Sequence, residues 1–241
     1  MDISLVKIIK GVPTGTAFVS YNDDGSRDFV FNIAHSAAAR FTGDDATITA
    51  LKTFNLDYFH VSGTALGDAS MCANVLRVVR ALHQASVRIS FDPNVRKELI
   101  ADAAYLSAMQ ELIGLCSIFL PSEDDATTLF PGQDLAHFAP PLLATNMDCL
   151  VLKKGGEGCE AMDRSGKHIK LTAHAVSVVD PTGAGDCFGA TFVTLMAGDP
   201  MDMATALAHA NAAGALAVTQ LGPMEGNSDL ARIQVLLARK S

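Results

Sequence analysis

The sequence predicts an α/β fold in which helices cover both faces of a mostly parallel central sheet and a small β-sheet lies over it. Two observations support this prediction. From about Asp57 onward, short apolar stretches alternate with segments of helical length, as in a parallel sheet with helical crossovers. Before Asp57, the chain is divided into short β-rich stretches with too little apolar surface to form a domain of their own.

Composition favours a folded protein and excludes several other classes. Of the 241 residues, 49% are hydrophobic and 18% are charged, so the chain can bury a large core and is not intrinsically disordered. The formal net charge of −8 argues against a partner that is a nucleic acid or an anionic membrane, since both need clustered Lys and Arg. Five scattered cysteines without a C-x-x-C pair, and no apolar run of membrane-spanning length, predict a cytoplasmic protein with reduced thiols.

The first elements are short strands. A turn signal at Asn22-Asp23-Asp24-Gly25 predicts a hairpin between the second and third of them. The β-rich stretches are Ile3–Ile9, Thr14–Tyr21 and Arg27–Ile33. We expect residues 1–35 to form a lid segment and residues 36–241 to form the core.

In the core, predicted strands alternate with helices until the chain ends in helices. The strands are Tyr58–Val61, Val87–Phe91, Ser117–Leu120 and Asp148–Lys153, and the helices between them are Ala69–Gln84, Ala101–Leu115 and Asp134–Ala144. A further β-rich region comprises Cys159–Asp163, His168–Thr172 and Val176–Val179. The last predicted helices are Ala184–Met196, Met201–Thr219 and Asp229–Arg239.

The stretch Val178–Ala190 is the most informative, because a β-branched strand leads through a glycine turn directly into an apolar helix. Gly183 and Gly185 allow close approach of a ligand, and the free N–H groups of the helix start form an anion site. Asp186 can stabilise the helix N-terminus, or it can accept a proton from a substrate hydroxyl during phosphoryl transfer. Position 188 is Phe, so the G-x-G-x-x-G dinucleotide fingerprint is not matched, and the Walker pattern is absent.

The run Asp180-Pro181-Thr182-Gly183-Ala184-Gly185-Asp186 closely resembles the ATP-site signature of the ribokinase-like (PfkB) carbohydrate kinases. Four other features resemble this family in the same order along the chain. They are the lid strands around Thr14–Ala17, the D-P-N-x-R strand end in Ser90–Arg96, the glycine turn Lys153–Gly158 and the Ala-rich helix in Ala208–Gly222. The resemblance covers nearly the whole chain and implies a ribokinase-like three-layer sandwich with a β-sheet lid.

The resemblance also implies an ATP-dependent sugar kinase with Asp186 as the catalytic base. The amides of Gly183, Ala184 and Gly185 would form the anion hole, and Arg96 would stabilise developing phosphate charge. The residues that would bind the nucleotide are Asn94, Lys153, Gly155, Gly156, Gly158 and Asn211. Taken singly, several have simpler interpretations: a strand-ending turn for Asn94, a hairpin turn for the glycines and a hydrogen-bonded packing role for Asn211.

Two metal sites follow from the same resemblance. Members of the family organise Mg²⁺ with an N-x-x-E element, and Ser122-Glu123-Asp124-Asp125 stands at that place, so Asp125 or its rival Glu123 would take this role. Asp180 and Thr182 match the family's loop for a monovalent cation, often K⁺. The seven histidines show no metal-ligand spacing. The implied cofactors are therefore ATP, Mg²⁺ and K⁺.

The lid strand Phe29–Ile33 resembles that of ketose kinases and 2-keto-3-deoxygluconate kinases. The latter typically offer an arginine in this strand, whereas position 33 is Ile, so a ketohexose is favoured and 2-keto-3-deoxygluconate comes second. Such lids often pair between subunits, which implies a homodimer.

Family members normally begin with a further βαβ segment, and the resemblance implies that this chain starts at the lid without it. The alternative function is a truncated, non-catalytic nucleotide-binding remnant. An NAD-dependent oxidoreductase would share the parallel-sheet fold but lacks its fingerprint here.

Overall fold

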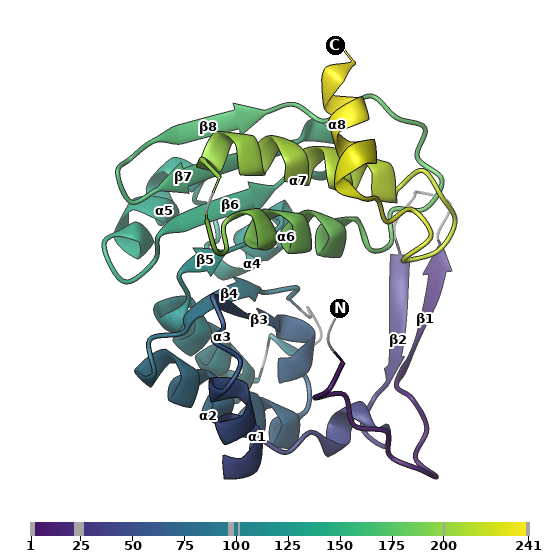
Figure 1. The fold of residues 1–241 in the computed structure, drawn as a ribbon, viewed down its shortest axis with the longest axis vertical. Coiled ribbons are helices and arrows are strands. Elements are labelled where there is room, and N and C mark those ends of the chain that lie inside the picture. The colour runs from purple at the N-terminus through teal and green to yellow at the C-terminus, as the bar shows by residue number, and fades with distance from the viewer. Residues whose placement is uncertain (1–2, 22–26, 96–98, 101, 200, 240–241) are drawn as a thin grey trace.

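The computed structural model describes residues 3–21, 27–95, 99–100, 102–199 and 201–239. Within these residues, a two-stranded hairpin stands beside a six-stranded sheet that is covered by helices on both faces (Figure 1). The first three strand pairs of the larger sheet are parallel and the last two are antiparallel. The predicted α/β fold with a mostly parallel sheet is therefore confirmed.

The hairpin consists of β1 (Thr16–Tyr21) and β2 (Arg27–Asn32), which pair antiparallel from Thr16↔Asn32 to Tyr21↔Arg27. The predicted pairing is confirmed, and the predicted turn at residues 22–25 lies outside the described residues. The predicted strand Ile3–Ile9 is wrong: this stretch is irregular, and most of its side chains are exposed. Its β-branched residues favour a strand only when a neighbouring strand pairs with it, and no such pairing is described there.

The six-stranded sheet has the order β3-β4-β5-β6-β7-β8. Its strands are β3 (Tyr58–Ser62), β4 (Arg88–Asp92), β5 (Ile118–Phe119), β6 (Cys149–Lys153), β7 (Cys159–Asp163) and β8 (His168–Leu171). The central strands β4 to β6 are almost fully buried, because side chains on both of their faces meet helices. The predicted strand Val176–Val179 is wrong; this stretch is irregular, and Val179 instead donates its amide hydrogen to Val218 O (2.7 Å).

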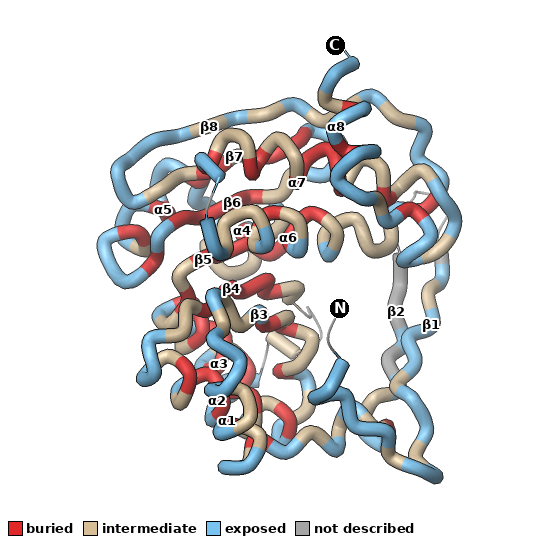
Figure 2. Tube along the Cα trace, in the orientation of Figure 1, coloured by how far each residue is buried: buried red, intermediate tan, exposed pale blue. Residues whose placement is uncertain are grey.

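Eight α-helices lie within the described residues. They are α1 (Asp45–Lys52), α2 (Ala69–Gln84), α3 (Ala103–Leu115), α4 (Glu123–Leu129), α5 (Leu135–Leu143), α6 (Ala184–Leu195), α7 (Met203–Ala217) and α8 (Leu230–Ala238). Helices α1 to α5 bury one face of the sheet, α6 and α7 bury the other, and α8 packs on α7. Figure 2 shows the buried residues concentrated in the central strands and in the helices beside them.

Two of these helices were not predicted from the sequence. Helix α1 is capped by Asp44, whose side chain accepts a hydrogen bond from Thr47 N (2.8 Å). Helix α4 is capped by Ser122, which forms a reciprocal capping box with Asp125. No helix in the described part of the chain has both the length and the apolar character needed to cross a lipid bilayer.

Candidate active site

The N-terminus of α6 lies on a turn that requires glycine. Gly183 has φ +82°, a left-handed conformation that is unfavourable for residues with a side chain. A Cβ atom at this position would lie 2.3 Å from Pro223 O. The loop that follows α7 therefore rests directly on the turn, and the predicted glycine turn is present at the start of the helix.

Polar groups at this helix start are open. Within the described residues, the amides of Gly183 and Gly185 donate no hydrogen bond, whereas Ala184 N donates to Pro181 O over a long 3.4 Å. Asp186 is exposed in the first turn, and no hydrogen bond or ion pair to its carboxylate is found in the described part of the chain. The turn can therefore offer two free amides and a free carboxylate to an anionic ligand and a hydroxyl group.

Asp180 connects the two segments that form the turn. Its carboxylate is buried, with Oδ1 accepting from Thr182 N (2.9 Å) and Oδ2 accepting from Gly222 N (3.0 Å). Val218 O accepts the amide hydrogens of Val179 and Asp180 at 2.7 and 3.2 Å. Asp180 and Thr182, the predicted monovalent-cation residues, are therefore brought together at the loop after α7.

A buried ion pair lies beside the turn. Lys153, at the end of β6, contacts Asp92, at the end of β4, and their side chains are only 13% and 10% exposed. Burial raises the pKa of Asp92, Lys153 offsets part of this rise, and Asp125 and Asp186 add to it. The Lys153 ammonium lies 3.6 Å from the position that a Cβ atom of Gly185 would occupy. The structure thus brings Lys153 to the glycine turn at the start of α6, and sequence reasoning did not identify Asp92 as its partner.

His60 is a second polar residue that sequence reasoning left unassigned. It lies opposite Ser90 in the β3–β4 register, and its Nδ1 shares a 2.9 Å hydrogen bond with Ser90 Oγ. His60 is exposed at the surface of its strand, but the protein around it partly removes water from the ring, which lowers its pKa; Lys153 lowers the pKa further, while Asp186 acts in the opposite direction. Two features of the sequence could have identified His60. It alternates with Ser62 along β3, so both side chains lie on one face of the sheet, and both are near the carboxyl end of the strand, where open α/β sheets bind their ligands.

The loop after β4 is held by Asp125. Asn94 has φ +36°, a left-handed conformation that asparagine tolerates better than most residues. The next residue, Val95, donates its amide hydrogen to Asp125 Oδ1 (2.7 Å), while Ser122 N and Oγ donate to Oδ2 at 2.9 and 2.7 Å. The predicted catalytic residue Arg96 lies outside the described residues.

Glu123 lies in different surroundings from Asp125. Its carboxylate is 3.6 Å from the Lys154 ammonium, which also pairs with Glu157 and Glu160. Lys154 alternates with Lys153 along the chain, so it projects to the sheet face covered by α1 to α5. The two metal candidates are therefore not brought together, and no cluster of three metal-ligating side chains occurs among the described residues.

The predicted nucleotide-side residues divide into two groups. Gly158 has φ +104°, and a Cβ there would lie 2.0 Å from Leu171 O. Asn211, which is buried in α7, donates from Nδ2 to Thr172 O (2.7 Å), so both residues contact the end of β8 and the residues directly after it. At Gly155 and Gly156, no described atom lies within 4 Å of the position that a Cβ would occupy, so the backbone there is open to a ligand.

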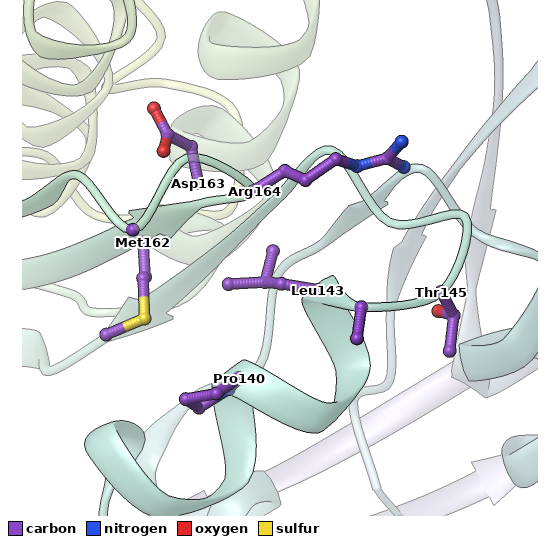
Figure 3. A pocket seen from close by; sticks show the side chains of 8 residues that line it. Pro140, Leu143, Thr145, Met162, Asp163 and Arg164 are labelled. Atoms are coloured by element: carbon purple, nitrogen blue, oxygen red, sulfur yellow. The ribbon is translucent and has the colours of Figure 1, made fainter.

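The two cavities described in the fold lie away from the turn at the start of α6. One, of about 350 Å³, lies between α5 and the turn after β7, where Met162 extends toward Pro140 (Figure 3). Arg164 in this cavity donates from Nε and Nη2 to Met147 O at 3.2 and 3.1 Å. The other, of about 240 Å³, contains Glu123 and Lys154. Neither is lined by Asp186, so the candidate site rests on its open amides and side chains.

The sequence model described as pfkB family carbohydrate kinase matches residues 1–230. The chain is 29% identical to a fructokinase of Salmonella typhimurium over 231 residues, covering 93% of this chain and 74% of the relative. It is 30% identical over 213 residues to a fructokinase of Salmonella thompson, covering 86% and 94%. It is also similar to the crystal structure of an E. coli protein, provisionally named Ribokinase II, in complex with ATP and Mg²⁺ (TM-score 0.84, 33% identity, 95% of this chain and 72% of that chain).

Proposed function

The chain belongs to the pfkB family of carbohydrate kinases, and we propose that it transfers the γ-phosphoryl group of ATP to a hydroxyl of a small sugar. The observation that carries this proposal is the start of α6, where a free, exposed carboxylate follows directly on a glycine turn with open amides. A helix N-terminus of this kind attracts a phosphate, and the carboxylate beside it is suited to deprotonate an alcohol.

In the proposed reaction, Asp186 accepts the proton of the sugar hydroxyl while the hydroxyl oxygen forms a bond to the γ-phosphorus. The bond between that phosphorus and the bridging oxygen of ADP breaks, and ADP leaves with the negative charge. The amides of Gly183, Ala184 and Gly185 stabilise the charge on the transferred group. Because Ala184 N already has a long contact to Pro181 O, Gly183 and Gly185 are the main donors.

On the nucleotide side, we assign Arg96 to the phosphates as a fixed charge. The remaining proposed nucleotide contacts are Asn94, Lys153, Gly155, Gly156, Gly158 and Asn211. The geometry supports these contacts to different degrees. The open backbone at Gly155 and Gly156 is suited to a flat ligand, whereas the bond from Asn211 to Thr172 O equally fits a packing role.

ATP would bring Mg²⁺ with it, and the chain need supply little, because this ion keeps several waters and binds mainly to phosphates. Asp125 fits a water-mediated contact better than Glu123, since Asp125 is next to the loop of Asn94 and Glu123 faces Lys154. Asp180 and Thr182 present oxygen atoms on the same turn as the Val218 carbonyl, and this grouping suits a monovalent cation such as K⁺.

We propose that residues 1–35 act as a lid over the sugar and that residues 36–241 form the core. Among the residues that the structure describes, the hairpin and the six-stranded sheet share no strand pairing, and Figure 1 shows the hairpin on the side of the molecule where α6 begins. Phe18 and Val30 lie opposite each other on the hairpin and are 65% and 66% exposed, which suits a homodimer paired through this lid. The fructokinase names of the relatives support a ketohexose acceptor over 2-keto-3-deoxygluconate.

Phosphoryl transfer to fructose, tagatose, ribose and 2-keto-3-deoxygluconate tests this function, with Asp186→Asn as the informative variant. We expect kcat to fall by about 10²- to 10⁴-fold while ATP binding persists. Asp45→Asn is a matched control, because Asp45 is also an exposed carboxylate in the first turn of a helix. Equal turnover by the wild type and Asp186→Asn would refute the role as base. Nucleotide binding by the wild type without sugar binding or transfer would favour the non-catalytic remnant.

A further inference from the structure

We propose that Asp92 is a positioning residue whose buried carboxylate holds the Lys153 ammonium at the start of α6, where Lys153 binds the γ-phosphate of ATP. This inference rests on the proposed kinase function. The sequence suggests that Lys153 lies near the nucleotide, and the structure indicates which phosphate it contacts and which side chain directs it there.

The first argument is the position of the Lys153 ammonium group. Lys153 Nζ lies 3.6 Å from the Cβ position of Gly185, so it is beside the amides that are proposed to hold the transferred phosphoryl group. An ammonium has three N–H donors, and Asp92 uses one of them. In the described part of the chain, Lys153 Nζ has no other hydrogen-bonding partner. Two donors therefore remain for a phosphate at this turn.

The second argument is the burial of the pair. A lysine side chain has four flexible carbons, so an ammonium without a partner samples many positions and is strongly hydrated. Here both side chains are about nine-tenths buried, and the carboxylate fixes the ammonium at the end of β6. Burying two charges carries a desolvation penalty that an apolar pair of similar volume would avoid. A ligand that needs a fixed positive charge at this point gives the pair a function beyond stability.

Lys154 provides a contrast within the same chain. It is the next residue after Lys153 and projects to the opposite face of the sheet, where Glu123, Glu157 and Glu160 surround it. Its charge is neutralised locally and lies away from the turn at Gly185. Loss of the Lys154 charge therefore controls for any general effect of removing a lysine from this strand end.

The test is isothermal titration calorimetry of the full chain with ATP and with ADP, each in the presence of Mg²⁺. For Lys153→Met, we expect the Kd for ATP to rise by about tenfold, as for the loss of one charged hydrogen bond, and the Kd for ADP to change by less than about twofold. Lys154→Met should leave both constants unchanged. Asp92→Asn should reduce the preference for ATP over ADP, because Asn does not hold the ammonium by charge.

The double variant Asp92→Asn/Lys153→Met should show the same ratio of ADP to ATP affinity as Lys153→Met alone, because Asp92 acts through Lys153. This neutral pair also provides a folded protein if the single variant is unstable. The inference would be overturned if Lys153→Met weakened the binding of ATP and ADP equally, or if it weakened the binding of neither. If the wild type still transfers phosphate and Asp186→Asn does not, that result leaves the proposed kinase function intact.

Discussion

Gly183→Ala tests whether the turn at the start of α6 depends on a residue without a side chain. The substitution places a Cβ at a residue with φ +82°, and this atom would lie 2.3 Å from Pro223 O. Contacts of Cβ atoms below 3.0 Å are essentially not observed, so the loop at Pro223 must move by about 0.7 Å or more. The residue before Pro223 ties this loop to the turn, because Gly222 N donates to Asp180 Oδ2 at 3.0 Å.

The expected loss of stability follows from these two contacts. A left-handed conformation costs a residue with a Cβ about 1–2 kcal/mol, and a weakened hydrogen bond to the Asp180 carboxylate costs about 1.5–3 kcal/mol. The free energy of unfolding should therefore fall by about 2.5–5 kcal/mol. For a chain of this length, the melting temperature should fall by about 5–20 °C. Since a displacement near 1 Å misplaces the open amides, kcat should fall by about 10²-fold.

Differential scanning fluorimetry and a coupled assay of ADP release measure the two effects on the same preparations. Gly114→Ala is a suitable control, because Gly114 is exposed in α3 and no described atom outside its own helix backbone lies within 4 Å of the added Cβ. We expect this control to gain about 0.5–1 kcal/mol of stability and to keep its activity. A Gly183→Ala protein that melts and turns over like the wild type would refute the reasoning about the turn.

Two further substitutions test the polar groups around the site. Lys153→Met leaves the Asp92 carboxylate buried without its counter-charge, so the free energy of unfolding should fall by about 3–5 kcal/mol at neutral pH. The unfolded-state pKa of Asp92 is the same in both proteins, so this loss relative to the wild type should be smallest at low pH. It should grow as the pH rises from the folded-state pKa of Asp92 in the wild type, which burial already raises, toward the still higher folded-state pKa in the variant. Urea unfolding across pH measures it, and a loss independent of pH would contradict the argument. Asn211→Ala removes the 2.7 Å bond to Thr172 O, so stability should fall by about 1 kcal/mol and ATP affinity by severalfold. Unchanged ATP affinity would limit Asn211 to packing.

Sequence analysis predicted the elements that have either a long amphipathic pattern or an apolar run typical of a strand buried on both faces. Strand β6 (Cys149–Lys153) and helix α2 (Ala69–Gln84) were expected nearly at their observed bounds, because an apolar run and a 16-residue amphipathic pattern are hard to mistake. Helices α1 and α4 were missed because they have only eight and seven residues, and about two turns are too few to reveal a helical repeat of apolar residues. Their capping residues were the available signal, since Asp44 and Ser122 each accept from a backbone amide three positions later.

The parts of the site that are contiguous in sequence were predictable, and those assembled by the sheet were not. Gly183, Gly185 and Asp186 lie within four residues, so their proximity follows from the chain itself. Asp92 and Lys153 are 61 residues apart, and their contact depends on β4 and β6 lying on either side of β5. Strand order of this kind is set by how all the helices pack, and a single sequence does not specify it.

The change from apolar to polar side chains across one sheet face explains why the candidate site lies at the start of α6. Ile118 and Cys149 occupy one row of the parallel register and join the apolar cluster under α6 and α7. In the same row, β4 and β3 carry Ser90 and His60 instead. No buried apolar residue of β3 or β4 joins that cluster among the described residues. Across this row, the sheet face changes from a packed apolar core to hydrogen-bonding groups beside Asp92, and this polar surface lies where α6 presents its open amides.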